Sequence, residues 1–401
     1  MSGIVVVGAG QAGAALVAKL RSLGYTGELT LLGREPVPPY QRPPLTKKYL
    51  TGELTLERLF LRPESFYGEH GITLRLGTEL RAIDRAARRL DLGGENLGYT
   101  QLALTTGSQP RRLPAAIGGN LEGVYVARDL ADTDAMAPEF APGRRVLIVG
   151  GGYIGLEAAA VAATKGLEVT LVEMAPRILN RVAAAETADW FRTLHERHGV
   201  TIIEGTGLDR LIGTGRVEAA RLSDGRELAV DFVIAGIGVR PNTALAESAG
   251  LEIDDGIATD AQGRTSDPAI WAAGDCASFP WRGGRVRLES VQNAIDQAEL
   301  VAGNMLGAGA AYDPVPWFWS DQYDAKLQIA GLNTGHDRVF TRPEGGQAMS
   351  VWYYRGDSFL AVDAMNAPRS YMVGKRLLEA GRSPDPQAVA DPQTDLKALL
   401  R

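Results

Sequence analysis

The stretch Gly3-Ile4-Val5-Val6-Val7-Gly8-Ala9-Gly10-Gln11-Ala12-Gly13 decides the fold of this chain. A short apolar run typical of a β-strand ends in a Gly-x-Gly-x-x-Gly loop, and small residues that favour a closely packed helix follow. Such a loop lets a pyrophosphate approach the backbone and lets the helix pack tightly on its strand. One loop of this kind is a weak signal, so its meaning depends on the rest of the chain.

The same pattern returns at residues 145–155. There Arg145-Val146-Leu147-Ile148-Val149 precede Gly150-Gly151-Gly152-Tyr153-Ile154-Gly155. Two loops, each between a strand and a helix, predict two dinucleotide sites on one polypeptide. Other apolar segments that predict strands, some of them ending in a turn of small residues, cover residues 28–32, 102–108, 168–173, 231–238 and 269–275. We therefore expect an α/β chain with two Rossmann-like dinucleotide-binding domains and a C-terminal α+β domain.

The order of these segments predicts that one nucleotide domain is inserted in the other. The first would comprise residues 1–111 and 241–315, the inserted domain residues 112–240, and the C-terminal domain residues 316–401. The proline-rich stretch from Pro36 to Pro44 is expected to lack regular structure. In the last domain, residues 348–363 alternate as in an antiparallel hairpin with its turn at Arg355-Gly356-Asp357.

Composition narrows the function classes. The 401 residues carry a net charge of −6 and are 45% hydrophobic, which suits two or three globular domains. The acidic balance argues against nucleic-acid binding, and no apolar run reaches the length of a membrane span. Because a strand begins almost at the first residue, we expect no signal peptide and a cytoplasmic location.

Cysteine and histidine usage excludes two further kinds of site. Cys276 is the only cysteine, so no dithiol pair can act within the chain, and we expect it to be a small buried residue. His195 and His198 lie three positions apart in an expected helix, without a third ligand nearby in the sequence. We predict that both are surface histidines and that there is no metal site.

Acidic residues near the glycine loops favour particular nucleotides. Glu173 ends the strand after the second loop, where a carboxylate accepts hydrogen bonds from ribose hydroxyls and repels a 2′-phosphate, so we expect NADH rather than NADPH. Glu35 is the corresponding acid for the first loop, although Arg34 precedes it. The alternative for Arg34 and Glu35 is a solvated strand end.

Three segments resemble the flavin-binding segments of the flavoproteins with two dinucleotide-binding domains, which have the glutathione-reductase-like fold. They are Gly8–Gly13, Thr106–Arg111 and Thr265–Asp275. Within this superfamily, Pro39-Tyr40-Gln41-Arg42-Pro43-Pro44-Leu45-Thr46-Lys47 resembles a segment of bacterial NADH–ferredoxin reductases. The resemblance continues at residues 126–128, 289–294 and 315–322 and so spans the whole chain; Trp317-Phe318-Trp319-Ser320-Asp321-Gln322 is its most specific part.

The resemblance implies FAD and NADH as cofactors and a [2Fe-2S] ferredoxin as partner. The ferredoxin would feed a haem-thiolate monooxygenase or an aromatic-ring dioxygenase. The expected assembly is a monomer or a weak homodimer. The alternatives are reduction of rubredoxin, of a quinone or of monodehydroascorbate, and a non-enzymatic role like that of apoptosis-inducing flavoproteins.

The resemblance also implies roles for three residues. Lys47 would lie near the reactive edge of the flavin, Glu157 would pair with Lys47 and aim it, and Trp319 would lie on the route to ferredoxin. The alternatives are a surface lysine, a first-turn helix acid favoured by the dipole, and a packing tryptophan. Basic residues that would dock an acidic ferredoxin are Arg282, Arg285, Arg287 and Lys326.

The cofactor-binding residues that the resemblance implies lie in all the segments above. The full set is Gly8, Gly10, Ala12, Gly13, Arg34, Glu35, Arg42, Pro44, Lys47, Leu80, Thr106, Gly107, Arg128, Gly274, Asp275, Glu289, Val291, Gln292, Trp319, Gly150, Gly152, Tyr153, Ile154, Gly155, Glu157, Glu173, Arg181, Gly236, Ile237 and Gly238. A helix that begins near Val291 would point its N-terminus at the flavin.

Overall fold

The structure is a computed structural model that describes residues 3–401, and it divides into two compact units. Unit 1 consists of the described part of Met1–Arg42 together with Leu54–Gln109 and Val239–Pro314. Unit 2 consists of Pro43–Glu53, Pro110–Gly238 and Val315–Arg401. Each unit contains one of the two glycine loops.

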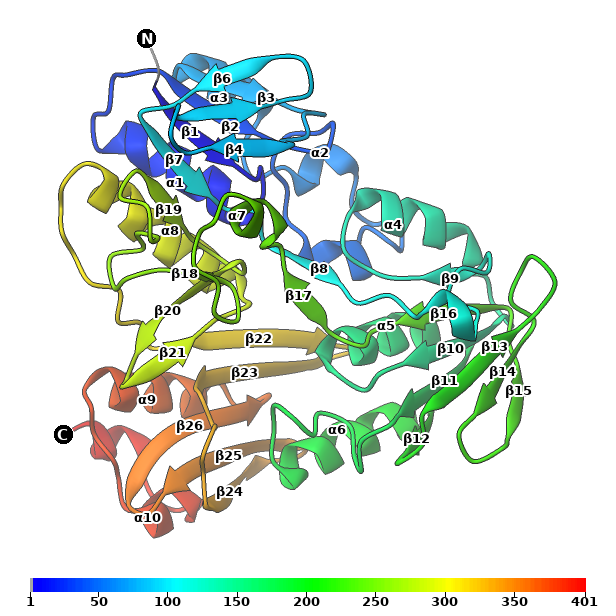
Figure 1. The fold of residues 1–401 in the computed structure, drawn as a ribbon. Helices are drawn as coiled ribbons and strands as arrows, with labels where there is room; N and C mark the ends of the chain where they lie inside the picture. The colour runs from blue at the N-terminus through cyan, green and yellow to red at the C-terminus, as the bar shows by residue number, and fades with distance from the viewer. Residues whose placement is uncertain (1–2) are drawn as a thin grey trace. The chain divides into compact units, whose positions relative to one another are not determined.

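Unit 1 is built on the five-stranded parallel sheet β19-β7-β1-β2-β3 (Figure 1). Alternate residues of a strand point to opposite faces, so the apolar run of β1 (Ile4–Val7) serves two cores. Ile4 and Val6 pack with helices α1 (Gln11–Ser22) and α8 (Val291–Met305), whereas Val5 and Val7 pack with the small sheet β4-β5-β6 on the other face. This double burial explains why the strand has no polar residue.

The remaining elements of unit 1 are short. The strands of its main sheet besides β1 are β2 (Leu29–Leu32), β3 (Ile72–Arg75), β7 (Gln101–Leu104) and β19 (Ile270–Ala272). Its other strands are β4 (Ala82–Asp84), β5 (Arg89–Asp91), β6 (Asn96–Gly98), β8 (Ser108–Pro110, which ends at the unit boundary), β17 (Val239–Pro241), β18 (Ile257–Ala258), β20 (Ala277–Trp281) and β21 (Gly284–Val286). Its short helices are α2 (Leu56–Leu59), α3 (Glu64–Glu69) and α7 (Ala244–Ser248).

Unit 2 contains a second parallel sheet of the same kind, in the order β12-β11-β10-β16-β9. Its central strand β10 (Arg145–Val149) again serves two cores. Val146 and Ile148 pack with helices α5 (Tyr153–Thr164) and α6 (Ala185–Arg197), and Leu147 and Val149 pack with the sheet β13-β14-β15. The predicted pair of Rossmann-like sheets is therefore confirmed.

An antiparallel sheet, β22-β23-β26-β25-β24, forms the rest of unit 2. Trp352 and Tyr354 pack against helix α9 (Pro368–Glu379), while Val351 and Tyr353 face the core shared with α5 and α6. The predicted hairpin is confirmed: Arg355 pairs with Ser358, so Gly356 and Asp357 form the turn. The fold class, with a C-terminal antiparallel domain, is the predicted one, and the three domain boundaries stay a prediction.

Unit 2 contains further strands and helices. Its further strands are β9 (Val124–Tyr125), β11 (Glu168–Glu173), β12 (Thr201–Glu204), β13 (Leu208–Ile212), β14 (Ala219–Leu222), β15 (Glu227–Ala229), β16 (Phe232–Ala235), β22 (Trp317–Gln322), β23 (Ala325–Gly331), β24 (Arg338–Gly345), β25 (Ala348–Arg355) and β26 (Ser358–Met365). Its further helices are η1 (Pro43–Thr46), η2 (Ala115–Ile117), α4 (Leu130–Met136), η3 (Ala137–Glu139), α10 (Pro386–Ala390) and η4 (Leu396–Leu400). Because η1 begins at Pro43, the prediction of no regular structure up to Pro44 is wrong at its last two residues.

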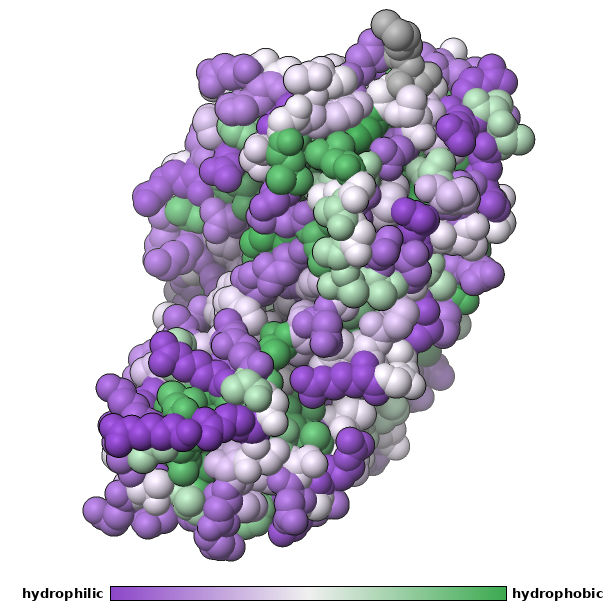
Figure 2. Space-filling view, turned by 90° about the vertical axis from the view of Figure 1, so that its left-hand side faces the viewer, coloured by the Kyte–Doolittle hydropathy of each residue, from purple (hydrophilic) through white to green (hydrophobic). Residues whose placement is uncertain are grey.

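The surface is mainly hydrophilic on the face shown in Figure 2, where hydrophobic residues form separate patches. Large apolar side chains that are clearly exposed in the described residues are Leu23, Ile154, Met174, Val182, Ile253, Leu306 and Met372. Within residues 3–401, no helix combines the length and the apolar character that crossing a bilayer requires.

Candidate functional site

The two glycine loops have the same internal geometry, although they lie in different units. Gly8 and Gly150 have φ angles of +114° and +106°, a region that residues with a Cβ rarely adopt. A Cβ on Gly13 would lie 2.0 Å from the carbonyl oxygen of Gly8, and a Cβ on Gly155 would lie 2.0 Å from that of Gly150. The first and third glycines are therefore required by the backbone turn and by the packing of the helix on the loop.

The middle glycines differ from their neighbours in a way that indicates a ligand. A Cβ on Gly10 or Gly152 would meet nothing within 4 Å, and their φ angles of −98° and −81° suit any residue. The protein itself therefore gives no reason for glycine at either position. The open space lies at the N-termini of α1 and α5, where free N–H groups favour a pyrophosphate. Both loops thus fit a bound dinucleotide.

In unit 2, several predicted residues surround the second loop. Glu173 lies at the end of β11, and its two carboxylate oxygens accept hydrogen bonds from the backbone N–H groups of Gly151 and Ala175, both at 2.7 Å. Gly236 lies beside the loop, since a Cβ on Gly150 would be 2.5 Å from its carbonyl oxygen. Arg181 lies near Gly238, 3.6 Å from the position of a Cβ there.

Two large apolar side chains that are close in sequence to these residues are exposed. Ile154, in the first turn of α5, is 42% exposed, and Met174, directly after Glu173, is 79% exposed. Ile154 is a predicted site residue. Met174 was not predicted as a site residue. The sequence feature that could have indicated it is an apolar residue directly after Glu173, the acid that ends β11.

In unit 1, a corresponding set gathers around the first loop. The Cβ of Ala12 lies 3.0 Å from the position that a Cβ on Gly274 would take. Helix α1 therefore lies close to the turn after β19. Asp275 accepts a hydrogen bond from Ser108 Oγ at 3.0 Å, and Thr106 Oγ1 donates to the carbonyl of Asn242 at 2.8 Å. Thr106, Gly107, Gly274 and Asp275 thus lie at the carboxyl ends of β7 and β19, on strands of the same parallel sheet.

Two buried polar residues that the sequence analysis missed hold these turns in place. Thr105 Oγ1 donates to the carbonyl of Gly8 at 2.9 Å, and the Thr105 carbonyl lies 2.2 Å from the position of a Cβ on Gly8. Gln297 Oε1 accepts a hydrogen bond from the N–H of Gly274 at 2.8 Å. Thr105 could have been predicted from the sequence, because it lies directly after an apolar strand. The role of Gln297 can be seen only in the structure.

Glu35 is not a solvated strand end, so that alternative is wrong for this residue. Its carboxylate forms an ion pair with Arg42 at 2.6 Å and accepts a hydrogen bond from the hydroxyl of Tyr40. Arg34 is exposed. Arg42 belongs to the predicted cofactor residues, and its guanidinium lies 5.1 Å from the centre of the Tyr40 ring.

Lys47 and Glu157 form an ion pair of 3.0 Å within unit 2. Their side chains are 20% and 12% exposed, so Lys47 is not a free surface lysine. Helix α5 begins at Tyr153, which puts Glu157 in the second turn and makes the alternative of a first-turn acid wrong. Burial raises the pKa of the Glu157 carboxyl, while the Lys47 ammonium and the Ser320 hydroxyl oppose that rise.

The other predicted residues lie on defined elements. Val291 and Gln292 begin α8 as predicted, after the helix cap Ser290, and Glu289 pairs with Arg287. Trp319 lies on β22, with its ring centre 5.7 Å from that of Trp317. Pro44 belongs to η1. Three other predicted residues lie between elements: Leu80 between β3 and β4, Arg128 before α4, and Ile237 between β16 and β17. The roles of these residues in cofactor binding stay predictions.

Two predictions about polar residues need correction. His195 is not a surface residue, because it is 0% exposed and bonded to Gln322 and Tyr323. No local sequence pattern predicts these partners, because they lie more than a hundred residues later in the chain. Arg287 is 11% exposed and donates to Asp255 and Asp275 carbonyls, and Arg285 donates to the carbonyls of Thr259 and Ser278. Arg287 therefore holds the chain together and is poorly placed to dock a partner, whereas Arg285 is exposed and its docking role stays a prediction. Among residues 3–401, no cluster of His, Cys, Asp and Glu could hold a metal.

Cys276 is fully buried, as predicted, and burial raises the pKa of its thiol. A nucleophilic thiolate is therefore disfavoured at this position, in line with a structural role.

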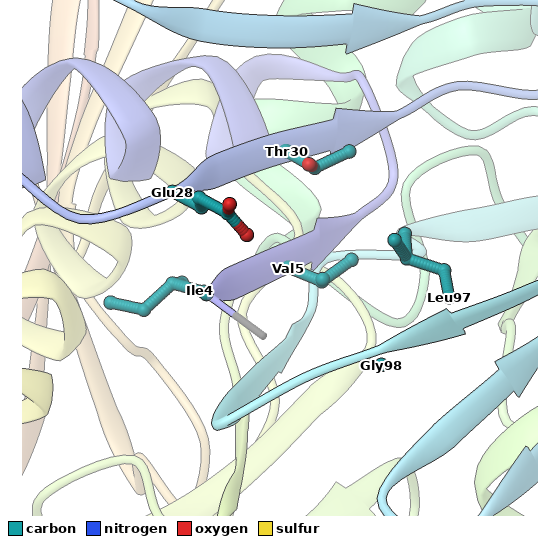
Figure 3. Close-up of a pocket in the computed structure, with 7 residues that line it drawn as sticks. Ile4, Val5, Glu28, Thr30, Leu97 and Gly98 are labelled. Atoms are coloured by element: carbon teal, nitrogen blue, oxygen red, sulfur yellow. The ribbon is translucent and has the colours of Figure 1, made fainter. Parts of the chain in front are cut away.

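A small cavity of about 160 Å³ lies at the amino end of β1 (Figure 3). It is lined by Gly3, Ile4, Val5, Glu28, Thr30, Leu97 and Gly98. The glycine loop follows the opposite, carboxyl end of this strand, and ligand pockets are typically several hundred Å³. The cavity is therefore not the dinucleotide site.

Comparison with known sequences places this geometry in a family. The profile of the family described as pyridine nucleotide-disulphide oxidoreductase matches residues 2–298, and that described as reductase C-terminal matches residues 317–400. This chain belongs to the pyridine nucleotide-disulphide oxidoreductase family. Because the chain has a single cysteine, membership of this family does not imply disulphide chemistry here.

The similarity to known proteins extends over nearly the whole of this chain and of each relative. A ferredoxin–NAD(P)+ reductase of Sphingomonas is 43% identical, with 99% of this chain and 97% of the relative covered. The ferredoxin–NAD+ reductase component of the anthranilate 1,2-dioxygenase system of Burkholderia cepacia is 39% identical, with 99% and 98% covered. The structure of the covalent putidaredoxin reductase–putidaredoxin complex matches with a TM-score of 0.95 and 38% identity, over 100% of this chain and 98% of that one. The predicted resemblance to ferredoxin reductases is confirmed.

Proposed function

We propose that this chain is an FAD-containing, NADH-dependent ferredoxin reductase, which passes electrons one at a time to a [2Fe-2S] ferredoxin of a monooxygenase or dioxygenase system. The observation that supports it best is the pair of glycine loops, each with open space at the middle glycine. The relatives named above, which are ferredoxin reductases, support the choice of acceptor. We further propose a cytoplasmic location, where NADH is available.

The residues of unit 1 would hold FAD. The N–H groups at the start of α1 would bind its pyrophosphate, and Glu35 would accept from its ribose hydroxyls while Arg42 holds the carboxylate in place. Asp275, Glu289 and the N-terminus of α8 would contact the rest of the cofactor. When bound, FAD can accept an electron pair from NADH and release single electrons to an iron–sulfur centre.

The residues of unit 2 would bind NADH in the same manner. The N–H groups at the start of α5 would bind the pyrophosphate, and Glu173 would accept from the adenosine ribose. A carboxylate there repels the 2′-phosphate of NADPH, which favours NADH. The exposed Met174 and Ile154 would offer apolar surface to the bound nucleotide.

The Lys47 ammonium would stabilise the negative charge that develops on the cofactor during reduction, and Glu157 would keep this ammonium aimed. Trp319 would lie on the route of electrons towards ferredoxin. The pair is largely shielded from water, which strengthens its electrostatic effect.

A panel of electron acceptors tests the proposal. The purified yellow protein is mixed with NADH and, in separate assays, with [2Fe-2S] ferredoxins, a rubredoxin, a quinone and monodehydroascorbate. We expect rapid turnover only with a ferredoxin and slow NADH oxidation without an acceptor. Rapid turnover with rubredoxin or a small molecule alone would overturn the assigned acceptor, and no flavin reduction by NADH would overturn the enzyme class.

A further inference from the structure

A continuous row of side-chain hydrogen bonds runs from the Lys47–Glu157 pair into the interior of unit 2. Ser320 Oγ lies 2.7 Å from Glu157 Oε1, the same oxygen that Lys47 contacts at 3.0 Å. Gln322 Nε2 lies 3.1 Å from Ser320 Oγ, and Gln322 Oε1 lies 2.8 Å from His195 Nε2. Ser320, Gln322 and His195 are at most 1% exposed, so water does not compete for these bonds.

The donors of this row all point towards Glu157. Since the amide oxygen of Gln322 can only accept, His195 Nε2 must carry the proton and donate. A neutral imidazole protonated at Nε2 has an acceptor at Nδ1, where the Tyr323 hydroxyl lies at 3.2 Å. The Gln322 amide then donates to Ser320, whose hydroxyl donates to the carboxylate. Bonds that point the same way polarise one another, and this row ends on a negative charge.

The backbone of β22 and of the turn after it determines where Ser320, Gln322 and Tyr323 lie. Side chains two apart on a strand share a face, so Ser320 and Gln322 of β22 both point to the side of α5 and α6. Tyr323 follows in the turn after β22 with a φ of +54°, a region that is costly for a residue with a bulky side chain. In this conformation its ring stacks on His198, with 3.7 Å between the ring centres.

A buried carboxylate needs such donors to remain ionised. Burial raises the pKa of Glu157, and the nearby Asp321 carboxylate adds to the rise, whereas Lys47 and Ser320 lower it. Burial also lowers the pKa of His195 to about 4, with a smaller contribution from His198 in the same direction, so the imidazole is neutral at pH 7. A neutral imidazole is what the donor order requires.

We propose that Ser320, Gln322 and His195 are positioning residues for the Lys47–Glu157 pair: the row fixes Glu157 Oε1 and keeps it ionised, and through it aims the Lys47 ammonium. The proposal rests on the proposed function, in which Lys47 assists flavin reduction by NADH. None of the three residues needs to touch NADH or flavin. They also give a chemical reason for the Ser and Gln of the segment Trp317–Gln322.

The first test compares pH profiles of flavin reduction by NADH in the holoprotein. In Ser320→Ala the carboxylate loses a donor, so its pKa rises further, and we expect the acid limb of the rate to move up by about one pH unit. Ser320→Thr keeps the hydroxyl and should keep the wild-type profile. Ser350→Ala is the matched control, because Ser350 is also fully buried in the same sheet and donates to a carboxylate, that of Glu344 at 2.8 Å.

The outcomes separate the two proposals. A shift in Ser320→Ala that Ser320→Thr and Ser350→Ala lack supports the positioning role. Equal profiles for Ser320→Ala and Ser350→Ala, or equal shifts for the alanine and threonine variants, would overturn it. If NADH does not reduce the wild type at all, the proposed function fails, and the positioning role fails with it.

The second test does not depend on activity. The chain has four histidines, so nitrogen NMR of histidine-labelled holoprotein can resolve them, with His195→Phe as the assignment variant. We expect His195 to stay neutral with its proton on Nε2 from pH 8 down to pH 5. We also expect Gln322→Leu to change the Nε2 signal. An imidazolium, or a proton on Nδ1, would contradict the donor order even if the holoprotein is active.

Discussion

At the scale of single residues, the Lys47–Glu157 pair shows what a sequence motif can and cannot predict. The pairing follows from the resemblance of Pro39–Lys47 to a reductase segment, and the 3.0 Å ion pair agrees with it. His195 shows the opposite case. Its partners lie on β22 and the following turn, more than a hundred residues later in the chain, and no local pattern announces them.

Removal of the Lys47 ammonium gives the first prediction. Lys47→Met should retain flavin but slow its reduction by NADH about 100-fold, the scale of losing one charged group that stabilises a transition state. Glu157→Gln should slow it less, and the double variant should be no worse than Lys47→Met, because the two residues act as a unit. Stopped-flow absorbance measures all four rates. Additive effects would show that the pair does not act together.

Glu173 determines the second prediction. Glu173→Ala should raise the KM for NADH about tenfold and narrow the preference over NADPH, because the acceptor for the ribose and the repulsion of the 2′-phosphate are both lost. Steady-state assays with both nucleotides measure it, with flavin content as the control for folding. An unchanged preference would mean that the ribose acid lies elsewhere.

At the scale of elements, the glycine loops could be predicted fully and the loops that surround them could not. The strand–loop–helix order of residues 3–22 and 145–164 follows from apolar runs and glycine spacing, and β1, α1, β10 and α5 lie where expected. Glu35 and Arg42 are seven residues apart in an irregular segment, and their ion pair depends on a turn whose path the sequence does not specify.

The third prediction separates a structural from a binding glycine on one loop. Gly155→Ala would place a Cβ 2.0 Å from the Gly150 carbonyl and should lower the melting temperature. Gly152→Ala would meet no protein atom within 4 Å and should leave the melting temperature unchanged, but weaken NADH binding. Calorimetry and NADH titration of both variants check this. Full NADH affinity in Gly152→Ala would show that no pyrophosphate approaches there.

At the scale of the whole molecule, two buried titratable groups in unit 2 affect how the free energy of unfolding depends on pH. Their two effects have opposite signs. Asp363 is fully buried, bonded to Tyr353 and Thr187, and burial raises its pKa to about 6. Its contribution to stability is complete below pH 3.8 and is lost as pH rises through about 6. His195, with its pKa lowered to about 4, contributes fully above pH 6.5 and loses the contribution as pH falls through about 4.

The fourth prediction follows from these opposite signs. Between pH 4 and pH 6, the free energy of unfolding of Asp363→Asn should rise more steeply with pH than that of the wild type. The reason is that the variant keeps the contribution of His195, which rises with pH, and loses that of Asp363, which falls with pH. In His195→Phe it should rise less steeply. Each difference in slope is about 1 kcal/mol per pH unit, the effect of roughly one proton. Denaturant titrations at several pH values measure the slopes, and a change of the same sign in both variants would contradict the assignment.

The central claim concerns the molecule as a carrier of electrons between NADH and a ferredoxin. The most direct test is an anaerobic stopped-flow experiment in which the purified yellow protein is mixed first with NADH and then with an oxidised [2Fe-2S] ferredoxin. We expect rapid bleaching of the flavin absorbance by NADH, slow bleaching by NADPH, and rapid recovery when ferredoxin is added. A flavin that NADH does not bleach, or that bleaches and recovers only with oxygen, a quinone or rubredoxin, would contradict the claim.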